Sequence, residues 1–303
     1  MTVKPAPRNI GASVRQRLLN LTRAGGPPFN ILLTRYVLER LLYRLTLTPH
    51  AGRFVLKGAM LVTTWFPDPH RQTRDLDLLG FGDSAPDAIL AIFSDVCAIQ
   101  LDDGVNIDVD GLRADLLREA LEYGGLRLRT TATVGGARVN VVVDIGFGDA
   151  IEPGIEEIDL PVLLDQPSPR LMAYARETVI AEKFQAMTVL GHANTRYKDF
   201  YDLWALSRAY AFEGDRLARA IRATFDRRRT VIPAIPPDAL TPAFANDPMK
   251  RQQWARYIQD LKTSGLDLRQ VIADLAAFLM SHAEQARGLP IGQSTKATPQ
   301  SER

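Results

Sequence analysis

The pattern of apolar residues changes part-way along the chain, and this change limits the folds that the chain can adopt. Up to residue 166, stretches with a period of two, typical of strands, alternate with stretches that have helical spacing. From residue 168 onward the spacing is helical only. With 303 residues, the chain has room for about two domains at ~150 residues each. We therefore expect an α/β domain with N-terminal helices over residues 1–166, an all-helical domain over 167–290 and a disordered polar tail over 291–303.

The same spacing predicts the individual elements. In the first half, helices are expected at residues 12–24, 30–45, 58–66 and 85–99, with a further candidate at 114–119. Strands are expected at 53–57, 73–79, 105–109, 126–133 and 138–145, the last two forming a hairpin through the turn Gly135–Gly136. In the second half, helices are expected at 177–190, 196–210, 215–226, 250–263 and 266–286, with a proline-rich loop over 231–248.

Composition excludes several classes of protein. The net charge is only +2, so no overall basic field indicates a nucleic-acid binder. The single cysteine, Cys97, cannot form an intramolecular disulfide and is expected as a small buried hydrophobe. The four histidines lie in no cluster with zinc-ligand spacing. No apolar run approaches the ~20 residues that span a membrane, and residues 1–15 lack a secretory signal, so we expect a cytoplasmic protein without a membrane partner.

Two aspartates give the first indication of chemistry. Asp75 and Asp77 are two residues apart on an expected strand, so both carboxylates project from one face while Leu76 and Leu78 face the other way. Two such charges repel each other unless a cation lies between them, and Mg²⁺ prefers carboxylates together with substrate phosphates. The alternative for an isolated pair of this kind is two acids that face water on an edge strand.

The residues around this pair favour a phosphate site. The expected helix at residue 58 begins at Gly58, where backbone N–H groups can approach a phosphate closely. Arg71 and Arg74 flank the acids and suit a triphosphate. Asp144 ends the β-branched strand at 138–145, and three carboxylates converge if that strand lies beside the first. Three acids that hold two metals are the template for in-line phosphoryl or nucleotidyl transfer, with Asp149 as the competing third acid.

Four segments resemble the motifs of the AbiEii/AbiGii-type nucleotidyltransferase toxins. Residues 57–60 (KGAM) with 71–78 (RQTRDLDL) resemble the first motif, and residues 144–148 (DIGFG) resemble the second. Residues 176–184 (RETVIAEKF) resemble the third, and residues 196–203 (RYKDFYDL) resemble the fourth. The motifs occur in the order of the family and cover residues 57–203. The sequence departs from the superfamily pattern at Ala59, where a serine that binds triphosphate is usual.

The resemblance implies an α+β fold, with a polymerase-β-like nucleotidyltransferase mixed sheet and helices followed by an all-helical C-terminal domain. It implies an NTP substrate and a cofactor of Mg²⁺ or Mn²⁺ held by Asp75, Asp77 and Asp144. It also implies the following site residues: catalytic Asp75, Asp77, Asp144, Lys183 and Asp202, and nucleotide-binding Lys57, Gly58, Arg71, Arg74, Lys183 and Asp199. Some relatives are toxins, paired with an antitoxin, that transfer nucleotides to the 3′ end of tRNA.

Helical geometry places charges on two apolar stripes. Lys183 falls on the stripe of the helix expected at 177–190, and Asp199 falls on that of the helix at 196–210, with Asp202 at its edge. Buried charges are costly unless paired, so one interpretation is a structural ion pair between Lys183 and Asp199. The other is that Lys183 binds the triphosphate while Asp202 or Asp199 supports it.

A run of basic residues lies on the helix expected at 215–226 and just after it. It consists of Arg216, Arg219, Arg222 and residues 227–229. A solvated helix face and a contact with an RNA backbone are both compatible with it.

Three functions remain open from the sequence. The first is transfer of a nucleoside monophosphate from an NTP to an acceptor hydroxyl, with the tRNA 3′ end as acceptor by family analogy. The second is the same transfer to a small molecule or a protein. The third is nucleotide binding without turnover, which the replacement of the usual serine by Ala59 would permit.

Overall fold

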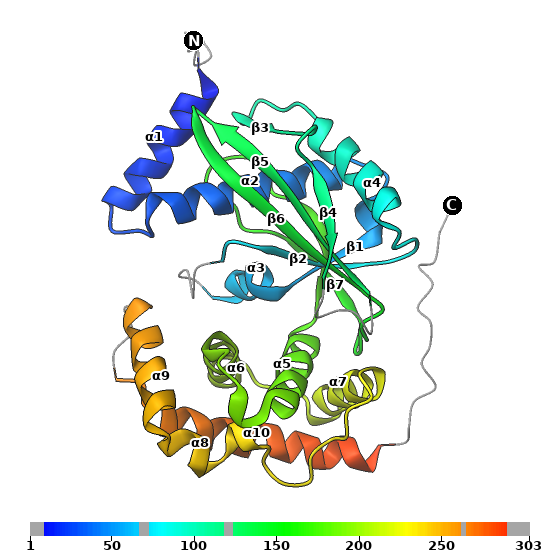
Figure 1. Ribbon diagram of the computed structural model, residues 1–303, viewed down its shortest axis with the longest axis vertical. Coiled ribbons are helices and arrows are strands. Elements are labelled where there is room, and N and C mark those ends of the chain that lie inside the picture. The colour runs from blue at the N-terminus through cyan, green and yellow to red at the C-terminus, as the bar shows by residue number, and fades with distance from the viewer. Residues whose placement is uncertain (1–8, 67–72, 118–123, 262–264, 290–303) are drawn as a thin grey trace. The chain divides into compact units, whose positions relative to one another are not determined.

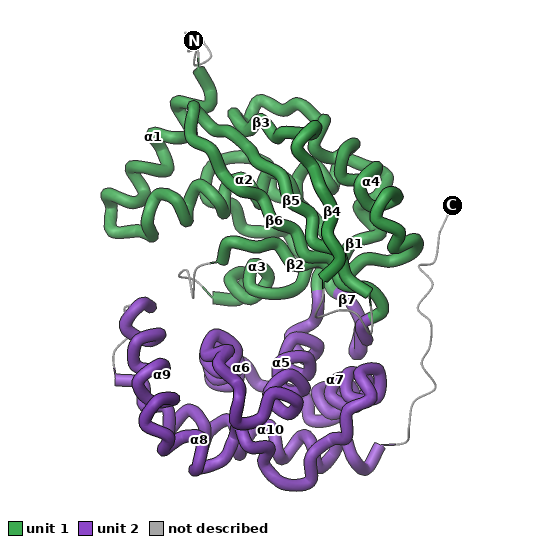
Figure 2. The backbone as a smooth tube through the Cα atoms, viewed as in Figure 1, with its two compact units in different colours: residues 1–148, 156–173 green, residues 149–155, 174–303 purple. Residues whose placement is uncertain are grey.

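A computed structural model of the chain describes residues 9–66, 73–117, 124–261 and 265–289. These residues form two compact units, shown in Figure 2. Unit 1 comprises residues 1–148 and 156–173, and unit 2 comprises 149–155 and 174–303. The expected domain boundary at residue 166 remains a prediction, and the expected disordered tail at 291–303 lies outside the described residues.

Unit 1 is built on a mixed sheet. The order of the described strands is β3-β5-β6-β2-β1-β8-β7, and β4 pairs with β5. The strands are β1 (Phe54–Lys57), β2 (Leu76–Gly80), β3 (Val105–Ile107), β4 (Arg113–Leu116), β5 (Gly125–Val134), β6 (Ala137–Phe147), β7 (Ile155–Asp159) and β8 (Arg170–Tyr174). Strand β2 runs parallel to β6 and antiparallel to β1, whereas β5 and β6 are antiparallel. The mixed sheet expected for an α+β fold is confirmed.

The hairpin of β5 and β6 is formed as expected. Gly135 and Gly136 have φ values of +52° and +79°, which glycine adopts without steric cost and which a tight hairpin turn requires. Val134 pairs with Ala137 on either side of this turn. The turn therefore fixes the register of the whole hairpin, which Figure 1 shows as two long strands.

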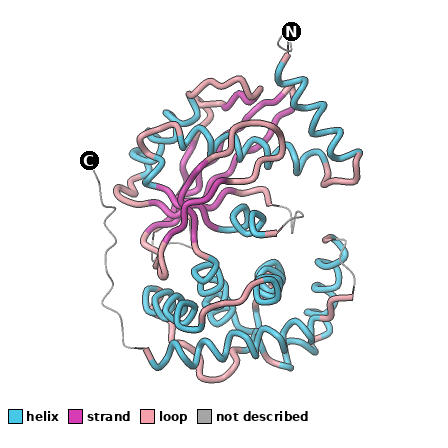
Figure 3. Tube along the Cα trace, turned by 180° about the vertical axis from the view of Figure 1, so that it is seen from behind, coloured by secondary structure: helices cyan, strands magenta, loops and turns pink. Residues whose placement is uncertain are grey.

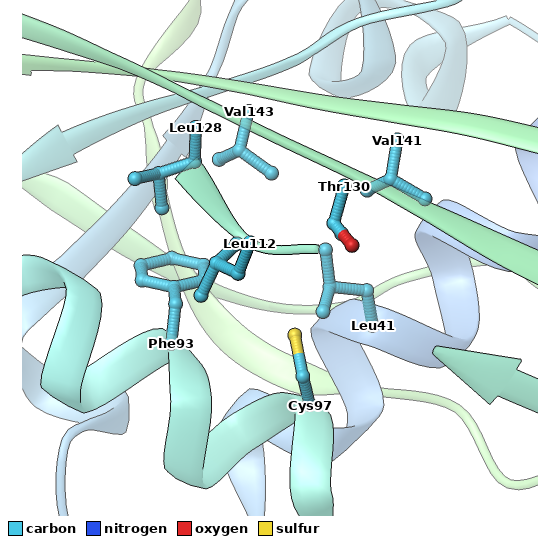
Figure 4. A pocket seen from close by; sticks show the side chains of 8 residues that line it. All are labelled: Leu41, Phe93, Cys97, Leu112, Leu128, Thr130, Val141 and Val143. Atoms are coloured by element: carbon cyan, nitrogen blue, oxygen red, sulfur yellow. The ribbon is translucent and has the colours of Figure 1, made fainter. Parts of the chain in front are cut away.

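Helices α2 (Phe29–Thr46) and α4 (Pro86–Ala98) cover one face of this sheet (Figure 4). The other helices of unit 1 are α1 (Ile10–Arg23) and α3 (Gly58–Val62). Figure 4 shows Leu41 of α2 with Phe93 and Cys97 of α4 opposite Leu128 and Val143 of the sheet. Cys97 is buried as expected, and burial raises the pKa of its thiol to about 12. The apolar side chains of the strands thus face α2 and α4, and the alternate side chains face the other way.

Several expected elements of this unit are corrected. The candidate helix at 114–119 is wrong, because residues 113–116 form β4 and pair with β5, where the partner strand satisfies their backbone groups. The strand expected at 73–79 begins only at Leu76, so Asp75 precedes it. Strands β7 and β8 were not expected.

Unit 2 consists mainly of helices, as Figure 3 shows. These are α5 (Arg176–Leu190), α6 (Tyr197–Ala209), α7 (Gly214–Arg227), α8 (Pro242–Asn246), α9 (Pro248–Asp260) and α10 (Leu268–Gly288). The loop expected at 231–248 contains α8, which begins at a proline and is capped by the Thr241 side chain. No helix among the described residues is long and apolar enough to cross a bilayer.

A buried ion pair holds α2 to the loop that precedes β3. The Arg44 guanidinium donates to both carboxylate oxygens of Asp103, at 2.6 and 3.1 Å, and the two side chains are 1% and 2% exposed. Arg44 also donates to the carbonyl oxygens of Ile99 and Val105. Because its donors are satisfied in this way, a charge that would be costly to bury is accommodated.

We predict that Asp103→Asn lowers the free energy of unfolding by about 3–5 kcal/mol, because Arg44 becomes a buried charge without its counter-charge. Urea denaturation measures this. The matched control is Asp115→Asn, whose partner Arg129 and own side chain are about half exposed (51% and 54%). This control is expected to cost about 0–1 kcal/mol. Equal effects of the two substitutions would contradict the prediction.

Candidate active site

Five charged residues form one row across the strands of unit 1. Lys57 of β1 pairs with Asp77 of β2, and Asp77 pairs with Asp144 of β6. Asp144 pairs with Arg127 of β5, and Arg127 pairs on its other side with Asp115 of β4. Directly paired residues on neighbouring strands project from the same face of a sheet. The row therefore places two acids side by side, with a basic residue on each flank.

Asp144 is held by a bidentate ion pair. The Arg127 Nε atom donates to Oδ1 at 2.6 Å, and Nη2 donates to Oδ2 at 2.6 Å. The Arg127 and Asp144 side chains are 34% and 18% exposed. Such a fork restrains the plane of the carboxylate and neutralises much of its charge.

Asp77 lies directly against Gly58, the first residue of α3. A Cβ atom on Gly58 would lie 1.9 Å from Asp77 Oδ2 and 2.6 Å from its Cβ, which is far inside van der Waals contact. Gly58 also has a φ of +68°, a backbone conformation that favours glycine. The sequence suggested that Gly58 serves phosphate approach; the structure adds that Gly58 makes room for the Asp77 carboxylate.

The remaining residues that were predicted for the site do not join the row of charged residues. Asp75 and Arg74 are exposed and precede β2, and Arg71 lies outside the described residues. Asp149, the competing third acid, belongs to unit 2 and forms an ion pair with Arg228 at 3.0 Å. Within the described ranges, no three His, Cys, Asp or Glu side chains are gathered to hold a metal ion. The predicted convergence of three acids is therefore seen for Asp77 and Asp144 only.

This pair of acids nevertheless fits a divalent cation. Asp77 and Asp144 offer carboxylate oxygens on one face of adjacent strands. Mg²⁺ is bound in many phosphoryl-transfer sites by one or two carboxylates, with water and substrate phosphates as the other ligands. The donor set is thus chemically suitable, and Asp77 and Asp144 are the residues that could hold the ion.

In unit 2, Lys183 is the centre of a nearly buried ion cluster. Its Nζ atom lies 2.5 Å from Asp199 Oδ1 and 2.9 Å from Asp202 Oδ2. Arg196 Nε donates to the second oxygen of Asp199 at 2.6 Å. Lys183 is 11% exposed, and the two aspartates are 1% or less. The expected ion pair of Lys183 with Asp199 is present, and it includes Asp202.

The charges of this cluster determine the pKa of Asp199. Burial alone would raise the pKa of this carboxyl. The neighbouring Lys183 and Arg196 lower it by more, so the pKa of Asp199 lies below its ordinary value. Asp199 therefore stays ionised and keeps Lys183 in place.

Arg127 and Arg196 take part in these clusters but were not predicted from the sequence. The signal for Arg127 was present, because a hairpin that turns at Gly135 and Gly136 pairs residue 127 with residue 144 when residues are counted back from the turn. Arg196 lies one helical turn before Asp199, a spacing at which side chains meet.

The basic run near α7 is largely neutralised. Four of its arginines form ion pairs within unit 2: Arg216 with Glu177, Arg219 with Glu152, Arg222 with Asp226, and Arg228 with Asp149. This pairing favours the structural interpretation of these four residues over contact with an RNA backbone.

Comparison with known proteins identifies the family. The family model described as nucleotidyl transferase AbiEii toxin, type IV toxin–antitoxin system, matches residues 40–279. The chain belongs to the AbiEii family. It is therefore a nucleotidyltransferase, and the resemblance seen in the four motifs is confirmed. Membership implies an NTP substrate and an antitoxin partner.

Solved structures of limited similarity accompany this match. A candidate nucleotidyltransferase from Helicobacter pylori has a TM-score of 0.47 at 17% identity, covering 86% of this chain and 97% of that chain. The protein JHP933 from Helicobacter pylori has a TM-score of 0.45 at 16% identity, covering 90% and 94%. No curated protein has a sequence that matches the chain.

We predict that Gly58→Ala lowers the free energy of unfolding of this AbiEii-family protein by about 2–4 kcal/mol, through backbone strain and overlap with Asp77. Chemical denaturation measures it. Gly124→Ala is the control, because Gly124 has a similar φ of +77° but open space around it. That substitution should cost only about 1 kcal/mol. If the two variants lose the same stability, the contact with Asp77 has no energetic weight.

We predict a pH-dependent effect of Asp199→Asn. The folded-state pKa of Asp199 is depressed below the reference value of 3.8, so its stabilising effect is fully present above pH ~4 and is lost as pH falls through the folded pKa. Wild type should therefore exceed the variant by about 3–5 kcal/mol at pH 7, and the difference should shrink towards pH 2–3. Denaturation curves at several pH values measure this. A difference that stays constant down to pH 2.5 would exclude ionisation of Asp199 as its cause.

Proposed function

We infer that the chain is a metal-dependent nucleotidyltransferase that moves a nucleoside monophosphate from an NTP to the 3′ end of tRNA. The observation that carries the metal site is the register of β2 and β6, which sets Asp77 beside Asp144 on one face. Gly58, which leaves room for the Asp77 carboxylate, is the second support.

Asp75, Asp77 and Asp144 are the proposed ligands of Mg²⁺ or Mn²⁺. When bound, the metal supplies charge neutralisation at the pyrophosphate leaving group and lowers the pKa of the attacking hydroxyl. Gly58 leaves room for the Asp77 carboxylate, and Asp144 is held in position by its fork with Arg127. Asp75 precedes β2 and is exposed, so in this proposal it joins the other two acids only in the loaded enzyme.

Basic groups are proposed to bind the triphosphate. Lys57 flanks Asp77 in the row, and Arg74 and Arg71 come before the acids in the sequence. At Ala59 no hydroxyl is available, so backbone N–H groups take its place in this proposal. For Lys183, the role of binding triphosphate is carried over from the motif resemblance, with Asp199 and Asp202 as the acids that fix its ammonium group.

The acceptor and the cellular setting are inferred from the family. Transfer to tRNA is known of some members of the family, and a small molecule or a protein is the alternative acceptor. The toxin activity is proposed to act in the cytoplasm and to be countered by a cognate antitoxin.

The experiment is transfer of label from each α-labelled NTP, in the presence of Mg²⁺ or Mn²⁺, to total tRNA, small molecules or protein. We predict label at the tRNA 3′ end, and a loss of more than about 100-fold in Asp77→Asn, since even groups that only orient metal ligands cost about 10–100-fold. The control is Asp165→Asn, an exposed acid whose partner is Arg17, which should retain wild-type transfer.

The outcomes separate the parts of the proposal. Label on a small molecule or polypeptide alone would remove tRNA as the acceptor and keep the chemistry. Full activity of Asp77→Asn, or full activity in excess chelator, would overturn the assigned metal site.

A further inference from the structure

Arg127 occupies the edge of the Asp144 carboxylate at which a divalent ion could bind both of its oxygens. Its guanidinium donates to both carboxylate oxygens, each at 2.6 Å. A carboxylate accepts such a fork through its two outward lone pairs, and these are also the lone pairs that favour a cation. A divalent ion that binds the same oxygens meets the positive charge of the guanidinium at short range.

The row also explains why the metal-free protein needs a positively charged side chain beside Asp77 and Asp144. Asp77 and Asp144 are directly paired, and neighbouring strands are only ~4.8 Å apart. Two carboxylates at that spacing repel each other strongly unless a positive charge is close. Arg127 supplies that charge from the strand on the far side of Asp144.

Arg127 is able to leave. Its side chain is 34% exposed, so its guanidinium already has access to water and can move away from Asp144 without displacing buried side chains. The contrast is Arg44, whose side chain is 1% exposed and whose donors are fixed by Asp103 and carbonyl oxygens. Arg44 is a permanent structural ion, whereas Arg127 has the properties of an exchangeable one.

We propose that Arg127 is a built-in counter-charge that holds Asp144 beside Asp77 in the metal-free protein and is displaced when a divalent cation binds. The inference rests on the proposed metal dependence of the site. It makes Arg127 a positioning residue that opposes metal binding. The metal affinity of the site then depends on how well the metal ion competes with the Arg127 guanidinium for the Asp144 carboxylate.

The test is a titration of the full chain with Mn²⁺ in the absence of nucleotide. Binding is measured from the electron paramagnetic resonance signal of the Mn²⁺ that remains free. Arg127→Gln should bind Mn²⁺ about three- to fivefold more tightly than wild type, the change expected from the loss of one partly exposed ion pair. Arg127→Lys, which keeps the charge but cannot form the fork, should lie between them.

The control for charge alone is Arg170→Gln. Arg170 of β8 forms an ion pair with Glu157, and both side chains are exposed. It carries the same charge but does not pair with Asp144, so its removal should change Mn²⁺ affinity less than Arg127→Gln does. Thermal unfolding gives a second readout: Arg127→Gln should lower the metal-free Tm, and Mn²⁺ should raise its Tm by more than it raises that of wild type.

Several results would overturn the inference. Weaker Mn²⁺ binding in Arg127→Gln would mean that the guanidinium helps to build the metal site. Unchanged binding, no binding in either protein, or an equal gain in Arg170→Gln would show that Arg127 does not compete for Asp144.

The transfer assay keeps the two claims apart. Metal-dependent transfer together with unchanged Mn²⁺ affinity in Arg127→Gln would reject this inference and leave the proposed function standing. Tighter Mn²⁺ binding in Arg127→Gln, together with no transfer to any acceptor, would support this inference and reject the proposed function.

Discussion

The repulsion between Asp77 and Asp144 is the constraint on which the site in unit 1 depends. The parallel register of β2 and β6 brings these two acids together on one face of the sheet. On the other face of these two strands, Leu78 and Ile145 are buried. Neither strand can therefore turn its acid away without exposing core residues. The hydrophobic core therefore forces the like charges together, and the flanking basic residues make this arrangement tolerable.

Unit 2 solves a similar problem in a different way. Lys183, Asp199 and Asp202 are nearly excluded from water, and Arg196 supplies the second positive charge that balances the two acids. The row in unit 1 is only partly buried, and its acids retain access to solvent. Burial fixes the cluster of unit 2 as one arrangement, whereas partial exposure leaves the row of unit 1 open to exchange of its counter-ions.

Much of this could be predicted from the sequence, because the relevant patterns are local. The Gly135–Gly136 turn and the β-branched strand predicted the hairpin, and helical spacing placed Lys183 and Asp199 on facing stripes. The candidate helix at 114–119 failed because the pairing of β4 with β5 is a tertiary contact. The contact of Gly58 with Asp77 was also out of reach, since it depends on the path of the chain from β1 to β2.

The parallel pairing of β2 with β6 has a consequence for the order in which the protein is made. Asp75 and Asp77 emerge from the ribosome long before β6 (Ala137–Phe147) is complete. A nascent chain that ends before the hairpin turn contains Asp77 but not Asp144, and it lacks β6, the strand with which β2 pairs. Because non-local strand pairs form late, the proposed metal site of this AbiEii-family protein can form only after β6 has been synthesised.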